Sequence, residues 1–447
     1  MTVFCGIDWA ERHHDVAFVD ETGTLLAKAR ITDDAAGYHK LLAVLAEHGD
    51  SPDDPIPVAI ETSHGLLVAS LRTGSRRVFA INPLAAARYR DRHGVSRKKS
   101  DPGDALVLAN ILRTDMHAHR PLPADSELAQ AITVLARAQQ DAVWTRQQVA
   151  NQVRSLLREY YPAALLAFQG KQGGLTRADA RVILTLAPTP AKAAKLTLAQ
   201  LRGALKRSGR LRGCDAEAER LRDVFRAEYA HQLPGVEDAF GHQLLALLKQ
   251  LDATCQAADD LAEAATAAFH QHADSEILLS FPGLGPMLSA RVLAELGDDR
   301  ARFADARALK SYAGSAPITR ASGKKRFVGR RFVKNNRLIN AGFLWAFAAL
   351  TASPGANAHY RRRREHGDWH AAAQRHLLNR FLGQLHHCLK TQQHFDEQQA
   401  FAPLLPEPAC PANPTDFVDE NNGTSTEPRC RARTQSEGVT GARRPSH

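Results

Sequence analysis

Strand-like segments follow one another in the first 125 residues of the chain and disappear from about residue 126 to 273, and this division constrains the fold more than any other feature of the sequence. Three short strands are predicted in succession, in VFCGIDWA, HDVAFVD and TLLAKARI, and two more in IPVAIE and RVFAIN. Helical segments that alternate with the later strands are predicted at 35–47, 65–72 and 102–113. Consecutive strands followed by strand–helix alternation predict an α/β domain at 1–125, a mixed sheet with helices on its faces.

Residues 126–273 show only helical periodicity. One long helix is predicted at 127–161 and another at 241–270, since their apolar residues recur every three or four positions. An Ala-rich, basic helical stretch lies between them. Paired long helices with polar outer faces are typical of antiparallel coiled-coil arms and of dimer interfaces. We therefore predict a helical, coiled-coil arm at 126–273.

The remainder of the chain changes character twice. Gly, Pro and basic residues cluster at 274–358, where we predict a mainly helical domain. A basic helix that opens with RRRR at 361–364 is predicted for 359–400. The last segment, 401–447, holds seven prolines without helical periodicity and is predicted to be disordered.

Composition and motifs exclude several classes of protein. No apolar run approaches the roughly 18–20 residues that span a bilayer, and no signal peptide is predicted. The six cysteines lack zinc-site spacing, and neither a P-loop nor a GxSxG motif occurs. With a net charge of +10, the sequence predicts a soluble, cytoplasmic, multidomain protein with no membrane contact. A basic excess suggests a polyanionic partner.

Four acidic residues of the first domain stand where strands end or a helix begins: Asp8, Glu61, Asp101 and Asp104. Acids at the ends of neighbouring strands can converge at one sheet edge, and residues three apart share a helix face. Carboxylates so placed suit two magnesium ions, which assist phosphodiester cleavage. The alternative is structural: an Asp101 N-cap, an Asp104 that favours the helix dipole and an Asp8 in a turn.

Two basic segments predict contact with nucleic acid. The first, at 88–99, is predicted to be a mobile loop beside the acids, and it includes Arg97, Lys98 and Lys99. The second holds eight Lys or Arg in 18 residues with no acid, interleaved with Phe327 and Phe332. Its basic residues are Arg320, Lys324, Lys325, Arg326, Arg330, Arg331, Lys334 and Arg337.

Two local motifs accompany the second basic segment. ASGKKRFVGRRF predicts a glycine-turned hairpin, and NRLINAGFLWAFAAL a buried helix behind it. Upstream, PGLGP before an amphipathic helix is similar to a helix–hairpin–helix turn, whose glycine amides bind DNA phosphate. A plain helix cap is the alternative for PGLGP.

The segments GIDWAERHHDVAFVD, AIETSHG and RKKSDPGDALVLANILR resemble the DEDD transposases of bacterial insertion sequences. The first domain of that family is similar to RuvC-type Holliday-junction resolvases, and the Piv-type DNA invertases belong to it. The resemblance extends to about residue 400. It implies an RNase H/RuvC-like fold for residues 1–125 and a catalytic tetrad that binds Mg²⁺, formed by Asp8, Glu61, Asp101 and Asp104.

The resemblance also implies a nucleophile in the second basic segment. Family members carry Ser-Gly in their C-terminal transposase domain, which matches Ser322 in TRASGK; Ser315 in YAGSAP is the competing candidate. Without the resemblance, Ser322 would be a turn residue. The implied activity is strand cleavage and rejoining through a covalent phosphoserine and a Holliday-junction intermediate.

The implied partners are the DNA of the element ends and target, and a structured guide RNA called the bridge RNA. A site shared between subunits implies at least a dimer, with a tetrameric synapse. Alternatives remain at this point: a Piv-like site-specific invertase, a junction-resolving nuclease that uses only the acids, and a nucleic-acid-binding relic without catalysis.

Overall fold

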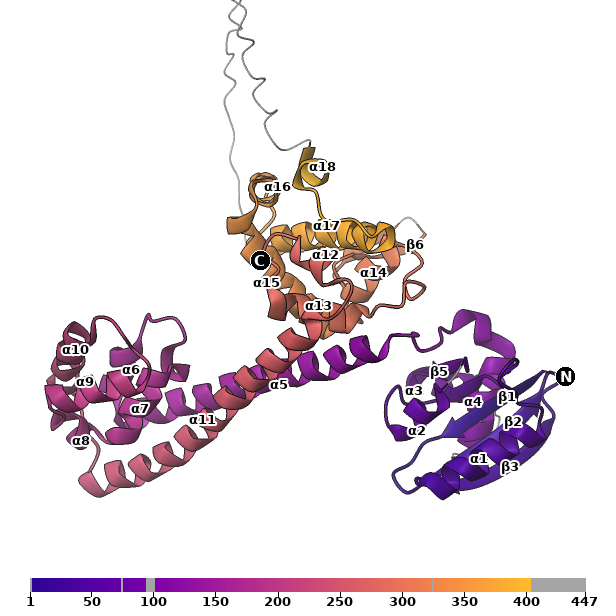
Figure 1. Ribbon diagram of the computed structural model, residues 1–447, viewed down its shortest axis with the longest axis horizontal. Coiled ribbons are helices and arrows are strands. Elements are labelled where there is room, and N and C mark those ends of the chain that lie inside the picture. The colour runs from indigo at the N-terminus through magenta and orange to yellow at the C-terminus, as the bar shows by residue number, and fades with distance from the viewer. Residues whose placement is uncertain (1, 74, 94–100, 324, 403–447) are drawn as a thin grey trace, which may run out of the picture. The chain divides into compact units, whose positions relative to one another are not determined.

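The computed structural model describes residues 2–73, 75–93, 101–323 and 325–402. Its first part contains a five-stranded sheet in the order β3-β2-β1-β4-β5 (Figure 1). The strands are β1 (Val3–Asp8), β2 (His13–Asp20), β3 (Leu25–Thr32), β4 (Val58–Ile60) and β5 (Val78–Ala80). Strand β2 is antiparallel to β1 and β3, whereas β1, β4 and β5 run parallel. The mixed sheet predicted from the sequence is confirmed.

Helices cover both faces of this sheet. Successive side chains of a strand point to opposite faces, so each strand contributes to two cores. On one face, Cys5 of β1 packs in a core with Leu41 of α1 (Ala35–Glu47) and Val68 of α2 (Leu66–Leu71). On the other, Phe4 packs with Leu108 of α4 (Asp101–Asp115), and α3 (Pro83–His93) lies in the same layer. A short 3-10 turn, η1 (Met116–Ala118), follows α4.

Helix α3 corrects the prediction of a loop at 88–99. Its first turn is favoured by Pro83 at the start and by the Asn82 side chain, which accepts a hydrogen bond from the Leu84 amide at 2.8 Å. The arginine-rich stretch therefore continues an Ala-rich helix as far as His93. The rest of the predicted loop, with Arg97, Lys98 and Lys99, lies outside the described residues.

Two long antiparallel helices follow, α5 (Glu127–Tyr160) and α11 (Pro234–His270). The Tyr160 ring stacks on Phe240 at one end, and Gln139 hydrogen-bonds the Ala258 carbonyl further along. Helix α11 begins at Pro234 rather than at residue 241, since proline suits the first helical turn.

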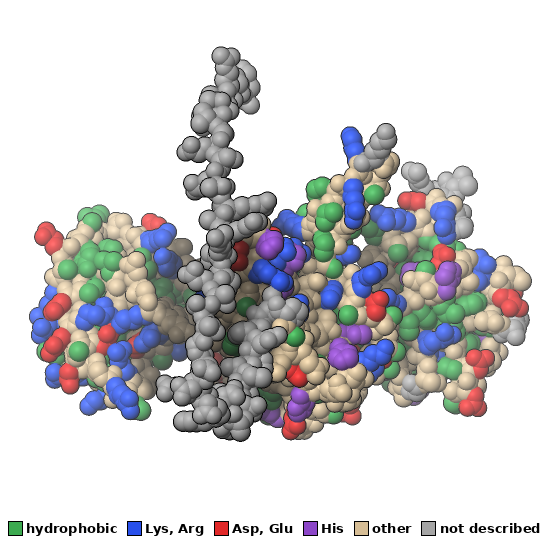
Figure 2. Space-filling model, turned by 90° about the horizontal axis from the view of Figure 1, so that it is seen from above, with side chains coloured by type: hydrophobic (Ala, Val, Ile, Leu, Met, Phe, Trp, Pro, Cys, Tyr) green, Lys and Arg blue, Asp and Glu red, His purple; other side chains and the backbone are tan. Residues whose placement is uncertain are grey.

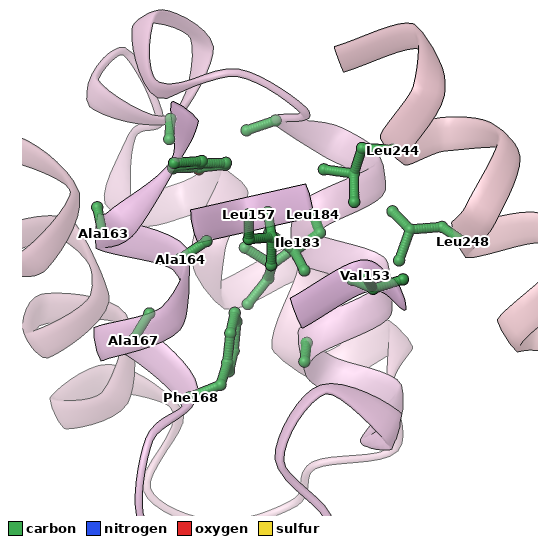
Figure 3. Packing of buried hydrophobic residues seen from close by; sticks show 14 of the residues in the cluster. Val153, Leu157, Ala163, Ala164, Ala167, Phe168, Ile183, Leu184, Leu244 and Leu248 are labelled. Atoms are coloured by element: carbon green, nitrogen blue, oxygen red, sulfur yellow. The ribbon is translucent and has the colours of Figure 1, made fainter. Parts of the chain in front are cut away.

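Five shorter helices and one 3-10 turn connect the long pair. They are α6 (Pro162–Phe168), η2 (Gly174–Thr176), α7 (Ala178–Leu186), α8 (Pro190–Ala194), α9 (Leu198–Arg207) and α10 (Cys214–Arg226). Figure 3 shows Leu157, Phe168 and Ile183 packed together with Leu244 of α11 in one core. The region, all of which is described, contains helices and no strands, as predicted, and the helical stretch predicted between the long helices forms a bundle with their ends. The coiled-coil arm stays a prediction.

The C-terminal part combines one hairpin with several helices. The hairpin is β6 (Ile318–Ser322) and β7 (Lys325–Gly329), as predicted, and the predicted buried helix is α15 (Asn336–Ala352). Its core stacks Trp345 on Phe381, with ring centroids 4.9 Å apart. The other helices are α12 (Ser275–Leu279), α13 (Pro286–Leu296), α14 (Ala306–Ala313), α16 (Pro354–Glu365), α17 (His370–Thr391) and α18 (Glu397–Phe401).

The single basic helix predicted for 359–400 is wrong. The chain forms α16 and α17 instead, separated at Gly367, which has a φ of +90°. Glycine adopts this left-handed conformation at low cost, so it ends the first helix. The tail predicted to be disordered lies outside the described residues from 403 onward. Among the described helices, none alone is long and apolar enough to cross a membrane; only α15 and α16, bent by 109°, pass that test together.

Candidate active site

Two of the predicted acids meet at one edge of the sheet. Strands β1 and β4 pair in parallel, with Ile7 opposite Ile60. Asp8 and Glu61 each follow that pair by one residue, so they lie at the same level at the carboxyl ends of adjacent strands. Both are half-buried.

The third acid approaches from α4, on the same side of the sheet. A side chain at Gly6 would place its Cβ 2.1 Å from the Ala105 carbonyl oxygen, so the helix backbone lies directly against β1. Gly6 and Asp8 share a sheet face by alternation, and Asp104 directly precedes the residue that Gly6 touches. The start of α4 therefore lies beside the edge that carries Asp8 and Glu61. For Asp101, only the backbone is described.

Asp104 is buried and paired with Arg90 of α3, at 2.5 Å between the guanidinium and the carboxylate. A buried carboxylate needs such a compensating cation. The sequence placed Arg90 among phosphate-binding residues of a loop, and the ion pair corrects that interpretation. No sequence pattern links the two residues, because they belong to different helices that only the tertiary fold brings together.

The donors at this edge are of the type that magnesium prefers, since carboxylate oxygens are hard ligands. Within the described side chains, no three His, Cys, Asp or Glu residues are already gathered closely enough to hold a metal ion. The fit therefore rests on the shared strand edge, the nearby helix start and the buried Asp104, whose charge Arg90 already compensates. A metal ion there would share Asp104 with Arg90.

Ser322 ends strand β6 at the turn of the hairpin. It pairs with Lys325 across a turn in which Gly323 has a φ of +54°. Its side chain is exposed, and none of the residues described in the structure hydrogen-bonds its hydroxyl. The hydroxyl is therefore accessible to a large substrate.

Ser315 has the opposite environment. It is fully buried after α14, and its hydroxyl donates to Asn379 at 2.9 Å while a second contact reaches the Lys310 carbonyl at 3.3 Å. Arg375 also binds the Ser315 carbonyl at 3.0 Å. A hydroxyl held in this way joins α14 to α17 and does not face a substrate.

The second basic segment divides into exposed and engaged side chains. Arg320, Lys325, Arg326 and Arg330 are exposed, whereas Arg331 and Lys334 are half-buried. Arg337 is bound to Asp141 of α5 at 2.8 Å and lies over the Trp144 ring, so it anchors α15 to α5. Lys324 lies outside the described residues.

The two glycines of PGLGP differ. Gly283, with a φ of +82°, lies against α15: a Cβ there would be 2.5 Å from the Ala349 amide nitrogen. Gly285 is exposed and precedes Pro286 at the start of α13. The first glycine therefore serves helix packing, and only the second leaves open space around it.

A buried polar cluster fixes the segment that leaves the hairpin. Glu295 of α13 accepts both hydrogen bonds of the Arg137 guanidinium, at 2.7 and 2.8 Å. The Asn335 amide donates to Glu295 and to the Tyr312 hydroxyl, each at 2.6 Å, and caps α15. The Glu295 carboxylate raises the pKa of Arg137. Sequence reasoning missed this cluster because its members are far apart in the chain.

The balance of basic and acidic residues differs between the hairpin region and the helical bundle. On helices α6 to α10, at the left of Figure 2, Lys and Arg side chains are interspersed with Asp and Glu. Residues 126–273 as a whole carry 18 basic and 15 acidic residues, whereas 274–358 carry 13 and 6. The concentrated basic charge thus belongs to the segment around Ser322.

Comparison with known proteins yields two family matches. Residues 5–162 match the DEDD transposases of IS110, described as a transposase family. Residues 275–361 match the transposase family of IS116, IS110 and IS902. The first match contains all four predicted acids, and the second contains Ser322.

Relatives match along most of the chain. The mini-circle candidate transposase for IS117 of Streptomyces coelicolor is 87% identical over 405 residues, 91% of this chain and 98% of the relative. The uncharacterized 42 kDa protein of insertion element IS900 of Mycobacterium paratuberculosis is 27% identical over 86% of this chain and 94% of its own length. The uncharacterized 44.8 kDa protein of IS116 of Streptomyces clavuligerus is 27% identical over 83% of this chain.

Proposed function

The chain belongs to the IS116/IS110/IS902 family of transposases, which are DNA-recombining enzymes, and we propose that it cuts and rejoins DNA with Ser322 as nucleophile and Mg²⁺ as cofactor. The catalytic tetrad in this proposal is Asp8, Glu61, Asp101 and Asp104. The observation that carries it is the pairing of β1 with β4, which sets Asp8 level with Glu61, together with the close approach of α4 at Gly6.

The four carboxylates would hold the metal, with Asp101 and Asp104 contributed by the first turn of α4. Bound Mg²⁺ neutralises charge on phosphate oxygens and makes an attacking oxygen more acidic. Arg90 holds Asp104 at its position beside the strand ends. Removal of Arg90 would leave a buried carboxylate without a compensating charge, so we assign Arg90 a positioning role.

The proposed chemistry is a pair of transesterifications. The Ser322 oxygen bonds to the phosphorus of a DNA phosphodiester while the bond to one deoxyribose oxygen breaks. The serine proton passes to a base or to solvent, and the departing sugar oxygen takes up a proton. A sugar hydroxyl of another strand then attacks the phosphoserine in the reverse sense, which restores the serine and joins the strands. Arg320 and Lys325 are the nearby cations that offset phosphate charge.

The proposal includes several further features. The acids of 1–125 and the serine of 274–358 would complete one site between subunits, which requires at least a dimer and suits a tetrameric synapse. Exchange would pass through a Holliday-junction-like intermediate. A structured guide RNA would share the basic surfaces with DNA, and the helices of 126–273 would separate the two catalytic regions. A Piv-like invertase would use the same residues on a fixed DNA site.

Substitution of the paired strand-end acids tests the metal site. Asp8→Asn and Glu61→Gln should each lower Mg²⁺-dependent cleavage of DNA carrying the element ends by at least about 100-fold, since each removes a charged ligand. The readout is strand cleavage on denaturing gels, with chelator-treated protein as the blank. Asp53→Asn, in an exposed loop, is the matched control and should cleave normally. Full cleavage by Asp8→Asn would refute the assignment.

A further inference from the structure

The β6–β7 hairpin is a two-stranded sheet whose strands are exposed along nearly their whole length. An isolated two-stranded hairpin is only marginally stable in water. Both of its faces carry large apolar side chains that are usually buried: Phe327 is 64% exposed and Val328 55%. The hairpin therefore has the character of a binding element whose partner is absent from the folded chain.

The register of the hairpin sorts these side chains by face. Directly opposite residues of an antiparallel pair share a face, and so do residues two apart on one strand. Ser322 pairs with Lys325, and Arg320 pairs with Phe327. These four side chains therefore share one face, whereas Arg326 and Val328 belong to the other.

The Phe327 ring lies close to Gly329 on that face. A Cβ built on Gly329 would lie 2.5 Å from an edge atom of the ring, so only a residue without a side chain leaves room for the ring there. The ring is 64% exposed, so its faces remain largely open to solvent. A phenylalanine side chain has few rotatable bonds and therefore loses little entropy on stacking.

We propose that Phe327 is a stacking platform for an unpaired DNA base beside the phosphate that Ser322 attacks. This inference rests on the proposed function of Ser322 and adds to it the class of substrate: DNA that is unstacked at the cleavage point. Aromatic side chains bind unpaired bases in this manner, whereas paired and stacked bases do not expose their faces.

Spacing and charge support this occupant. The pairs Ser322–Lys325 and Arg320–Phe327 are neighbours on the face, about 7 Å apart along the strands. A single nucleotide spans such a separation between its phosphate and its base. The segment from Arg320 to Arg337 carries eight basic residues and no acidic one, which favours a polyanion over an apolar protein partner.

Matched aromatic substitutions test the proposal. Phe327→Leu keeps apolar cover over Gly329 but removes the π face, and Phe327→Trp restores one. Phe347→Leu is the control, because Phe347 is 61% exposed but lies on α15, outside the basic segment. The probes are a single-stranded and a duplex oligonucleotide of one sequence, with 2-aminopurine at the base next to the cleavage point.

We expect Phe327→Leu to weaken single-strand binding by about 5- to 100-fold, with duplex binding changed less than about twofold. Wild type, Phe327→Trp and Phe347→Leu should quench 2-aminopurine emission on binding, and Phe327→Leu should not. Equal losses on single strand and duplex, or equal effects of Phe327→Leu and Phe347→Leu, would overturn the proposal. So would undiminished quenching by Phe327→Leu, because the ring would then serve only to cover Gly329.

The same titration in a Ser322→Ala protein separates this inference from the function on which it rests. Stacking does not need the hydroxyl, so Ser322→Ala should quench as wild type does. If Ser322→Ala forms normal covalent DNA adducts while quenching persists, the nucleophile assignment fails and the platform stands. If adducts require Ser322 but Phe327→Leu binds single strands normally, the platform fails alone.

Discussion

At the scale of single residues, His359 of α16 is a buried histidine in the C-terminal helices. It is 8% exposed, and neither ring nitrogen has a hydrogen-bond partner in the described structure. Burial, with added repulsion from Arg380 and Arg362, lowers the pKa of His359 to about 4. The neighbouring His376 also has a lowered pKa, mainly because of burial. Both imidazoles are therefore neutral in the folded protein at pH 7.

This environment predicts the direction of an acid effect on stability. A histidine with an ordinary unfolded pKa near 6.5 binds a proton in the unfolded chain before it does so in the fold. Stability is therefore retained above about pH 6.5 and lost as the pH falls toward about 4. For His359 the loss between pH 7 and pH 5 should be about 2 kcal/mol.

Urea denaturation at pH 7 and pH 5, followed by tryptophan emission, measures this loss, because Trp345 is buried in the fold and becomes exposed on unfolding. His359→Phe should reduce the difference between the two pH values by about 2 kcal/mol, since phenylalanine has no proton to bind. His366→Phe, at an exposed position after the same helix, should leave the difference unchanged. An equal pH dependence in wild type and His359→Phe would contradict the account of this histidine.

The residues that could be predicted from sequence are those whose local context determines their place. Asp8 and Glu61 follow apolar strands, and Ser322 stands beside the glycine of a hairpin, so each position follows from its neighbours. Arg90 and Arg337 could not be assigned in this way. Both belong to basic runs, but each finds an acidic partner, Asp104 or Asp141, that only the tertiary fold supplies.

At the scale of elements, the contact between β1 and α4 positions the candidate metal site. A Cβ added at Gly6 would lie 2.1 Å from the Ala105 carbonyl oxygen and 2.4 Å from the Ala109 amide nitrogen. These are backbone atoms of a helix, which cannot rotate away as a side chain can. The absence of a side chain at Gly6 thus sets how closely α4 packs against β1, the strand that ends in Asp8.

Gly6→Ala should push α4 away from the sheet. We expect a loss of stability of about 1–3 kcal/mol from overpacking. Cleavage of element-end DNA should fall by about 100-fold at substrate saturation, because displacement of a catalytic group by about 1 Å has that effect. Activity assays at a temperature well below the melting point separate the two consequences.

Gly235→Ala is the control for Gly6→Ala, since nothing lies within 4 Å of a Cβ there, in the first turn of α11. It should keep full activity. Normal cleavage by folded Gly6→Ala would mean that the placement of α4 does not govern the site.

Most element types follow from periodicity, but the sequence interpretation differs from the structure at α3 and at α16–α17. Helix α3 was predicted as a loop because its last turns are strongly basic, whereas packing of Ala86 and Tyr89 against the sheet stabilises a helix there. Helices α16 and α17 were predicted as one, because a single glycine at 367 only weakly interrupts the pattern. Tertiary packing decided the first case, and the left-handed conformation of Gly367 decided the second.

At the scale of the whole molecule, charge and chemistry are divided between segments. Residues 1–125 carry 15 basic and 17 acidic residues and include the tetrad, whereas 274–358 carry the largest basic excess and include Ser322. The net charge of +10 thus averages over a nearly neutral segment and a strongly basic one. The two family matches cover these same two segments.

The covalent step tests the central claim most directly. The protein, with Mg²⁺, the RNA that copurifies with it and labelled element-end DNA, should form a DNA adduct that denaturants leave intact and proteases remove. Ser322→Ala should abolish this adduct. Ser315→Ala should still form it, with only a loss of stability from the broken contact to Asn379. An undiminished adduct in Ser322→Ala, or its loss in a folded Ser315→Ala alone, would contradict Ser322 as the nucleophile.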